Sequence, residues 1–337
     1  MAATAEKIVE TARGLLADGR VDLVIGWEAG TLPLRARPAF VRKAEDAGRL
    51  TWNAFCGANL AAYLPQYFQV DAHARNVPEP PRIAVVAKGC EIRSIVGLVR
   101  EHQVLREKLT VIGVPCGGMI DPGKVEKLLG GDEVVSAEET ASGDIAVKTA
   151  SGAARTLTRA EVLGECCLEC ENSGTEGADV RIEGKPLRAS RSKYDGLREL
   201  EAMTPQQRWE KFSADISKCI RCYACRQACP NCYCKVCFVD RTKPEWLGAG
   251  NDESDLVVFQ IGRIFHQAGR CVDCGACVRA CPMNIDLRAF TLKPVKDVQE
   301  LFGYYPGLDP EQEAPLCTFR QDDSNKMVSE PKEASHG

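Results

Sequence analysis

Residues 219–230 read CIRCYACRQACP, and residues 271–282 read CVDCGACVRACP. Both stretches have the spacing Cys-x2-Cys-x2-Cys-x3-Cys-Pro, in which three close thiolates wrap one iron–sulfur cube and the fourth reaches the cube of the partner stretch. The two copies therefore predict two 4Fe–4S clusters with crossed ligation. Cluster I is expected on Cys219, Cys222, Cys225 and Cys281, and cluster II on Cys271, Cys274, Cys277 and Cys229.

Zinc sites and disulfides are the alternatives for such cysteine-rich stretches. Zinc knuckles pair Cys-x2-Cys motifs without a third close cysteine, so they do not explain this spacing. The chain has 18 cysteines, and its first residues show no secretory signal. This combination favours metal thiolates in a reducing compartment over a disulfide scaffold. We therefore expect a redox protein of the cytoplasm.

The composition sets limits on the possible partners. The chain has 337 residues, of which 45% are hydrophobic and 27% charged, and its net charge is −4. This charge gives no general reason to expect nucleic acid or an anionic membrane as a partner. No stretch approaches the roughly 20 apolar residues that a transmembrane segment needs. The length allows more than one domain.

A second pattern lies upstream of the cysteine runs. Residues 83–88 and 109–115 are continuous apolar runs, and a helical pattern covers 91–106 between them. Strand–helix–strand with fully apolar strands predicts a parallel pair covered on both faces. Cys90 and Cys116 follow the two strands. Because ligands gather at the carboxyl ends of parallel strands, these cysteines are candidates for one shared site. The equal alternative is that each is simply buried as a small apolar side chain.

Further cysteines follow an insertion with a different pattern. Residues 132–157 alternate polar and apolar side chains, as short antiparallel strands do. Residues 166–170 then read CCLEC, which contains the pair Cys167-x2-Cys170. One such pair alone is compatible with zinc, redox chemistry or chance. Together with Cys90 and Cys116, it makes a set of four thiols.

These patterns divide the chain into four expected parts. They are an N-terminal α/β segment at 1–78, an α/β cluster-binding core at 79–200, an α+β two-cluster ferredoxin-like domain at 201–300, and a partly disordered C-terminal extension at 301–337. Helices are expected at 4–17, 59–64, 195–217 with a break at Thr204–Pro205, and 255–268.

The cysteines at the two strand ends, the Cys167-x2-Cys170 pair and the segment Ala178-Asp179-Val180 resemble the beta-subunit family of coenzyme F420-reducing hydrogenase and F420-linked dehydrogenases. This family includes formate dehydrogenase beta subunits, and the resemblance spans roughly residues 80–200. Its members typically bind FAD and a 4Fe–4S cluster. The resemblance implies a third cluster, cluster III, on Cys90, Cys116, Cys167 and Cys170, with Cys166 as the alternative to Cys167.

One part of the family pattern is missing. The glycine-rich segment that the family associates with the flavin corresponds roughly to Gly26–Gly30, which reads GWEAG. Trp27 and Glu28 are poor residues where the backbone must approach a phosphate. We therefore assign no flavin-binding residue, and FAD remains an implication of the resemblance.

Three more cysteines follow the first cluster motif directly. Cys232, Cys234 and Cys237 lie within six residues, and this density predicts metal ligation. They could form a fourth cluster or a zinc site with Cys317, Cys56 or Cys166, or compete with Cys229 for cluster II. The fourth ligand is not assigned. The four histidines lie apart in the sequence, and none is predicted to be a ligand or a base.

Two functions fit these features. The first, which we predict, is an iron–sulfur electron-transfer subunit of a cytoplasmic multi-subunit oxidoreductase. The alternative is an FAD-containing subunit that exchanges a hydride with F420 or NAD(P)H and passes single electrons to the clusters. A zinc-stabilised interaction module does not fit the ferredoxin spacing. By family analogy, the expected partners are hydrogenase, formate dehydrogenase or heterodisulfide-reductase-like subunits in a hetero-oligomer. No catalytic residue is assigned, and whether the chain is itself an enzyme is left open.

Overall fold

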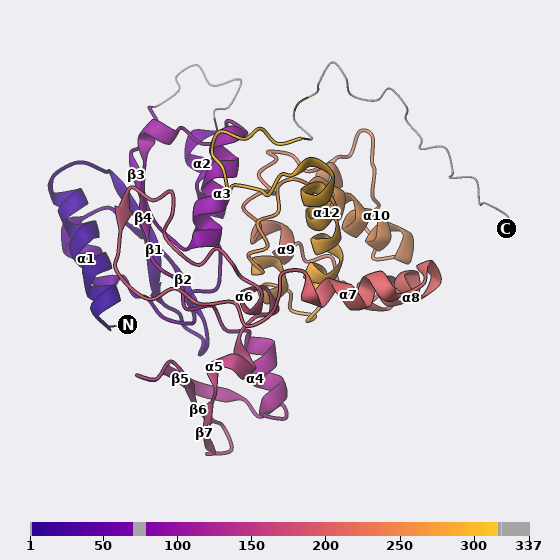
Figure 1. Cartoon of the computed structure of the whole chain (residues 1–337), viewed down its shortest axis with the longest axis horizontal. Coiled ribbons are helices and arrows are strands. Elements are labelled where there is room, and N and C mark those ends of the chain that lie inside the picture. The colour runs from indigo at the N-terminus through magenta and orange to yellow at the C-terminus, as the bar shows by residue number, and fades with distance from the viewer. Residues whose placement is uncertain (1, 70–78, 316–317, 319–337) are drawn as a thin grey trace.

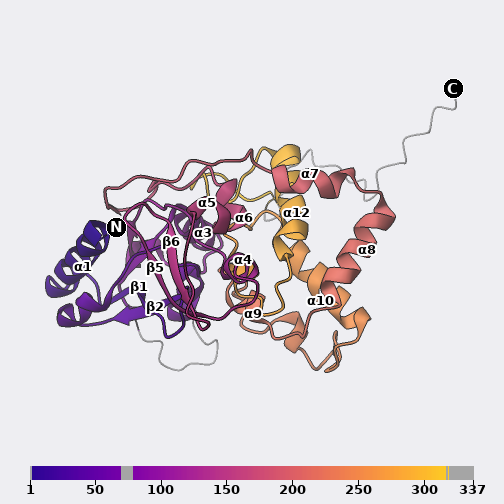
Figure 2. The same cartoon turned by 90° about the horizontal axis from the view of Figure 1, so that it is seen from below.

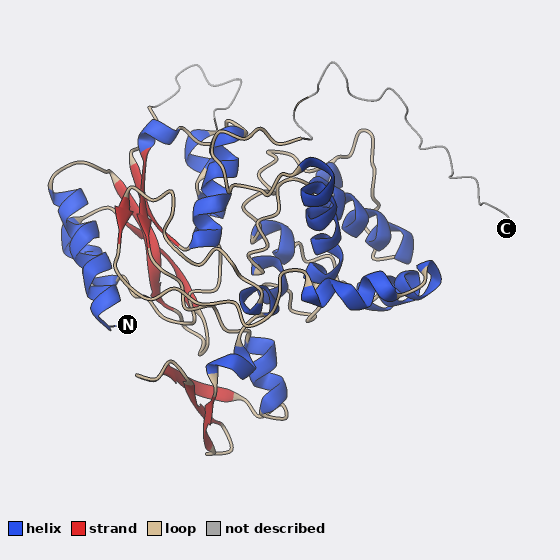
Figure 3. Cartoon of the chain, viewed as in Figure 1, coloured by secondary structure: helices blue, strands red, loops and turns tan. Residues whose placement is uncertain are grey.

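The computed structural model describes residues 2–69, 79–315 and 318. A five-stranded sheet with flanking helices forms one half, and a helical half that contains the two cysteine runs lies beside it (Figure 1). The strands cluster in the first half and in a small sheet below it (Figure 3). The expected α/β core is therefore confirmed, and a separate cysteine-rich region follows it in the chain.

The main sheet is mixed, with strand order β2-β1-β3-β4-β8. Its edge strand β2 is antiparallel to β1, and the other neighbours are parallel. Val85 pairs with Ile25 on one side and with Val111 on the other, so the predicted parallel pair occupies the middle of the sheet. The bounds are β1 Leu23–Ala29, β2 Ala36–Val41, β3 Ile83–Ala87, β4 Leu109–Gly113 and β8 Val180–Arg181.

Helices cover both faces of this sheet. All five residues of β3 are buried, as expected for a parallel strand between two layers. Helix α1 (Ala2–Ala17) covers one face and α3 (Gly89–Arg100) the other (Figures 1 and 2). Helix α1 buries Ile8, Ala12 and Leu15, which lie on one side of a 3.6-residue period. The helix expected at 4–17 is thus confirmed.

Helix α3 is shorter than the pattern predicted. It ends at Arg100 rather than at residue 106, because His102 has a left-handed backbone (φ 55°) and the amide of Gln103 turns back to the carbonyl of Leu98 at 2.8 Å. This geometry closes a helix and satisfies its last carbonyls. Residues 106–108 form a separate 3-10 turn. The helix expected at 59–64 is likewise a 3-10 turn, Leu60–Tyr63, which leads into α2 (Pro65–Phe68).

A small antiparallel sheet is inserted between β4 and β8. It consists of β5 (Val134–Glu139), β6 (Ile145–Thr149) and β7 (Ala154–Leu157), as the alternation in 132–157 predicted. Helices α4 (Pro122–Leu128) and α5 (Arg159–Val162) pack on it around a separate apolar core.

The cysteine-rich half consists of helices and long loops. Thr204 caps α8 with its side chain, and Pro205 starts that helix, so the predicted break at Thr204–Pro205 is confirmed. None of the helices in the described ranges is long and apolar enough to cross a membrane. The bounds are α7 Asp195–Ala202, α8 Pro205–Ile216, α9 Ala224–Gln227, α10 Glu253–His266, α11 Ala276–Arg279 and α12 Leu287–Phe302. The C-terminal residues that were predicted to be disordered, and Cys317, lie outside the described residues.

A buried ion pair fixes the turn from β3 into α3, which carries Cys90. The carboxylate of Glu91 accepts the backbone N–H groups of Lys88 at 2.8 Å and of Leu60 at 2.6 Å. The Lys88 ammonium lies 3.0 Å from that carboxylate and also donates to the carbonyl of Cys56. The two side chains are only 2% and 0% exposed. Because each charge is satisfied by the other and by backbone groups, the pair can remain buried.

Replacing Glu91 by Ala should destabilise the α/β half strongly. The change leaves the Lys88 ammonium buried without its counter-ion, which typically costs about 3–5 kcal/mol. Urea unfolding followed by circular dichroism would measure this loss. The matched control is Lys7→Ala, which breaks an exposed pair with Glu183 and should cost at most about 1 kcal/mol. Equal effects of the two substitutions would contradict the assigned role of the pair.

Candidate metal centres

The two cysteine runs form loops with the same backbone geometry. Arg221 and Tyr223 in the first loop have φ values of 48° and 60°, and Asp273 and Gly275 at the equivalent positions of the second have 56° and 67°. Three of these four residues are not glycine, so the left-handed conformation costs free energy and must be held by its surroundings. A short helix, α9 or α11, starts directly after each left-handed pair.

This geometry points backbone amides at the sulfurs. The amide of Arg221 donates to Sγ of Cys219 at 3.4 Å, and the amide of Asp273 donates to Sγ of Cys271 at the same distance. Such N–H groups stabilise thiolates and help to set the potential of a cluster. The cysteine spacing alone did not indicate Arg221 or Asp273 as donors. The donor set and the amide cradle both fit a 4Fe–4S cube.

The predicted ligands of cluster II lie around one cavity. Cys229 from the first motif lines it together with Cys271, Cys274 and Cys277 from the second. Burial raises the pKa of Cys274 to about 12 and that of Cys271 well above its ordinary value. Buried thiols of this kind stay protonated unless a cation stabilises the thiolate, and iron would supply that charge.

Three of the predicted ligands of cluster I lie in the core of the helical half. Cys225 is buried there, and Cys219 and Cys281 pack against the same core. Burial raises the pKa of Cys225 to about 11. The side-chain amide of Gln260 donates to Sγ of Cys219 at 3.5 Å. Cys222 is exposed, so this cluster would have one corner at the protein surface.

The set implied for cluster III also lines a single cavity. Cys90 and Cys116 reach it from the carboxyl ends of β3 and β4, and Cys167 and Cys170 reach it from α6 (Glu165–Leu168) and the turn after it. The amide of Gly118 donates to Sγ of Cys116 at 3.3 Å. The parallel strands place Cys90 and Cys116 together, and α6 with its following turn adds the other two cysteines. Four cysteines spread over 81 sequence positions, 90–170, thus meet at one cavity.

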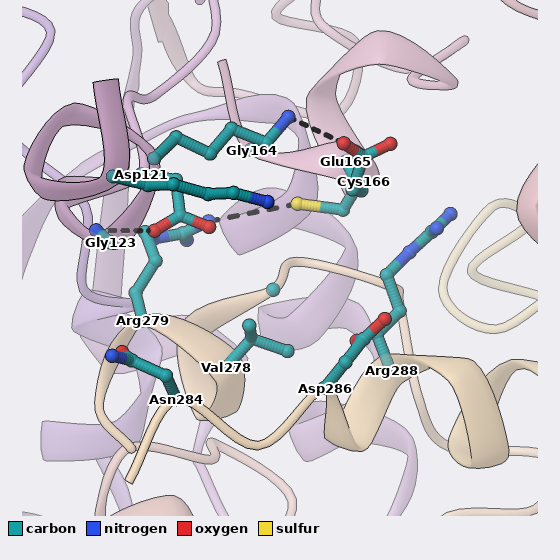
Figure 4. Close-up of a pocket in the computed structure, with 13 residues that line it drawn as sticks. Asp121, Gly123, Gly164, Glu165, Cys166, Val278, Arg279, Asn284, Asp286 and Arg288 are labelled. Carbon is teal, nitrogen blue, oxygen red and sulfur yellow. Dashed lines mark hydrogen bonds and ion pairs between the residues drawn. The ribbon is translucent and has the colours of Figure 1, made fainter. Parts of the chain in front are cut away.

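Cys166 and Cys167 occupy different surroundings. Sγ of Cys167 accepts the amide of Met119 at 3.4 Å, whereas Sγ of Cys166 accepts Nη1 of Arg279 at 3.6 Å. The sulfur of Cys166 points into a neighbouring pocket of about 490 Å³, which lies between the α/β half and the helical half (Figure 4). The two sulfurs are 3.9 Å apart, and both residues line the cavity of cluster III. We propose Cys167 as the ligand, because a backbone amide already faces its sulfur.

The other cysteines gather beside cluster II. Cys232, Cys234 and Cys237 line a pocket of about 300 Å³, and His266, which the sequence did not indicate, lies at its wall. The pKa of Cys232 is lowered because its sulfur accepts a hydrogen bond from the thiol of Cys229. A zinc site or a fourth cluster on these three cysteines remains a prediction. Their competition with Cys229 as a ligand of cluster II also remains a prediction. Cys56 is fully buried in the α/β core.

No group of three or more His, Cys, Asp or Glu side chains within residues 2–69 and 79–315 lies close enough to hold a single metal ion. A 4Fe–4S cube holds its four thiolates farther apart than a zinc ion, whose sulfur ligands lie about 2.3 Å from the metal. All 17 cysteines of the described ranges are free thiols.

The segment Gly26–Gly30 does not fit a flavin phosphate. Residues 26–29 lie inside strand β1, and Gly26 pairs with Ala39 of β2. Trp27 is fully buried. A phosphate-binding site needs free backbone amides in a loop, whereas residues 26–29 are extended and paired with β2.

Comparisons with known proteins agree with this architecture. Residues 81–237 match the family described as the C terminus of the coenzyme F420 hydrogenase/dehydrogenase beta subunit, and residues 265–285 match the 4Fe–4S binding domain. The chain is 25% identical to the F420-dependent formate dehydrogenase subunit beta of Methanocaldococcus jannaschii, over 86% of this chain and 88% of that protein. It is 24% identical to the F420-dependent formate dehydrogenase 1 subunit beta of Methanococcus maripaludis, over 88% and 89%.

A solved structure is also similar. One chain of the F420-reducing NiFe hydrogenase complex from Methanosarcina barkeri superposes with a TM-score of 0.38 and 17% identity, over 63% of this chain and 72% of that chain.

Cys222→Ser and Cys274→Ser should each remove one cluster, that is, about four iron atoms per chain. Each change deletes one thiolate of a four-thiolate site, while the β3–β4 core should stay folded. Iron and acid-labile sulfide assays on anaerobic protein, together with circular dichroism, measure both effects. Cys56→Ala, at a buried cysteine outside the cluster cavities, should keep the full iron content. Unchanged iron in either serine variant would refute that ligand assignment.

Substitution of Cys166 and of Cys167 tests which of the two thiols is the ligand of cluster III. Cys167→Ser should lose about four iron atoms, whereas Cys166→Ser should retain them, because only the Cys167 sulfur already has a backbone amide facing it. Iron content and the electron paramagnetic resonance (EPR) spectrum of the reduced protein distinguish the two variants. The reverse result would make Cys166 the ligand.

Proposed function

We propose that this chain, which carries the C-terminal domain of the coenzyme F420 hydrogenase/dehydrogenase beta subunit and a 4Fe–4S binding domain, relays single electrons through three clusters arranged in a row. It is an iron–sulfur electron-transfer subunit of an oxidoreductase. The observation that carries this proposal is the adjacency of the cluster cavities. Electron tunnelling between redox centres slows steeply with distance, so neighbouring cavities favour transfer from one cluster to the next.

Cluster II lies in the middle of this row. Cys274 and Asp273 line both its cavity and that of cluster III, and Cys90 of cluster III lies close enough to Cys274 for their charges to interact. On the other side, Cys277 of cluster II is an electrostatic neighbour of Cys225 of cluster I. The order is therefore I–II–III, and an electron that crosses the chain passes through cluster II.

The end at cluster I suits a protein partner. Cys222 is exposed, and the neighbouring side chains of Ile220 and Met283 are 50% and 38% exposed. Apolar surface beside a redox centre supports close docking of a second redox protein. Two relatives are named as beta subunits of formate dehydrogenases, which supports a place beside dehydrogenase or hydrogenase subunits in a hetero-oligomer. The many cysteines, most of them placed as cluster ligands, suit a reducing compartment such as the cytoplasm.

Cofactor analysis of anaerobically purified protein separates this proposal from the hydride-splitting alternative. We expect about twelve iron atoms per chain and no extractable flavin. Release of one FAD per chain on denaturation would instead favour the alternative, because a hydride carrier delivers two electrons and a cluster accepts one.

Removing the middle cluster tests the relay itself. In the complex purified with its own partner subunits, Cys271→Ser should slow the reduction, by the partner's substrate, of the cluster on the far side of the missing cluster II at least tenfold, as rapid-freeze EPR can follow. Dithionite, which reaches each cluster from solvent, should still reduce clusters I and III, as EPR can show. The Cys56→Ala complex is the control. An undiminished rate without cluster II would rule out the row.

A further inference from the structure

A buried arginine lies between clusters I and II. Arg263 is on helix α10, within the 41 residues that separate the two cysteine motifs. Its side chain is buried, with the residue only 4% exposed. Nη2 donates to the carbonyl of Cys225 at 3.2 Å, whereas Nε and Nη1 are buried without a hydrogen-bond partner. A buried guanidinium with unpaired N–H groups costs folding free energy unless an anion lies beside it.

The surroundings of Arg263 are thiols. Its charge interacts with Cys225 of the cluster I loop, with Cys229 and Cys277 of cluster II, and with Cys232. The side chain also lines the cavity of cluster II. The guanidinium thus faces the space that both cubes would occupy.

Carboxylates near the cluster loops are paired with other arginines. Asp255 pairs with Arg221, Asp240 pairs with Arg226, and Asp273 pairs with Arg288. Within the described residues, Arg263 has no carboxylate partner. The anion that would balance its charge is therefore not supplied by the folded chain.

We propose that Arg263 is the shared counter-cation of clusters I and II and that it raises the reduction potentials of both. This inference rests on the proposed clusters. A cube with four thiolates carries net negative charge, and each added electron makes it more negative. A fixed cation in a low-dielectric site stabilises the reduced form more than the oxidised form. The Nε and Nη1 groups, which have no partner in the chain, then donate to cluster or thiolate sulfur.

A purely structural role is the competing explanation. The long side chain of Arg263 also fills space under α9, and any substitution that disturbs this packing could perturb the clusters. Charge and shape are separable, because Lys keeps the charge with a different shape, whereas Met keeps much of the apolar length without the charge.

The test is an EPR-monitored redox titration of anaerobic full-length protein carrying Arg263→Met, Arg263→Gln or Arg263→Lys. The Met and Gln variants should lower the equilibrium constant for reduction of clusters I and II on the order of tenfold, or about 59 mV for one electron. The Lys variant should retain most of the wild-type potential. Arg226→Met is the control, because it removes a partly exposed charge that is already paired. Its shift should be smaller and should shrink in high salt, whereas the Arg263→Met shift should persist.

The measured potentials and cluster contents of the variants decide whether Arg263 acts through its charge. Wild-type potentials in a fully loaded Arg263→Met protein, or equal shifts in the Lys and Met variants, would overturn it. Loss of both clusters from the Met and Gln variants with retention in the Lys variant would support it, because charge alone then permits assembly. Loss of both clusters from all three variants would overturn it in favour of side-chain shape. Wild-type protein with fewer than two clusters would refute the proposed function itself.

Discussion

The proposed crossed ligation of two clusters is the constraint on which the cysteine-rich half depends. Cys229 belongs by sequence to the first motif, but it lies with the three close cysteines of the second. Neither loop can complete its own site, so each needs the other in place. The matched left-handed residues shape each loop around its own cysteines, because they turn the amides of Arg221 and Asp273 toward the sulfurs of Cys219 and Cys271.

The sheet imposes a second and independent constraint. A parallel pair brings the carboxyl ends of β3 and β4 to the same edge, which places Cys90 and Cys116 together. The buried Lys88–Glu91 pair then holds the turn at Cys90. The stability of the α/β half and the position of cluster III are therefore supported by the same local contacts.

The row of clusters arises where the two halves meet. Cys274, in the second ferredoxin loop, lines the cavity of cluster III as well as its own. Arg279 connects the halves by donating to the carbonyls of Gly57 and Cys274 and to the sulfur of Cys166. The proposed relay rests on this packing of the cysteine-rich half against the α/β core.

Sequence patterns alone determined the features that depend on near neighbours. The apolar runs of β3 and β4 and the break at Thr204–Pro205 predicted what the structure contains, because each encodes a local backbone geometry. The spacing of the cysteine motifs predicts the ligands of clusters I and II for the same reason. The helical periodicity of the sequence predicted the wrong end for α3. A single left-handed residue, His102, stops the helix, and no glycine marks this position in the sequence. The different surroundings of Cys166 and Cys167, the proposed order of the clusters and the unpaired charge of Arg263 came only from the tertiary structure. These features depend on which distant side chains meet in a buried space, and no spacing along the chain specifies such a meeting.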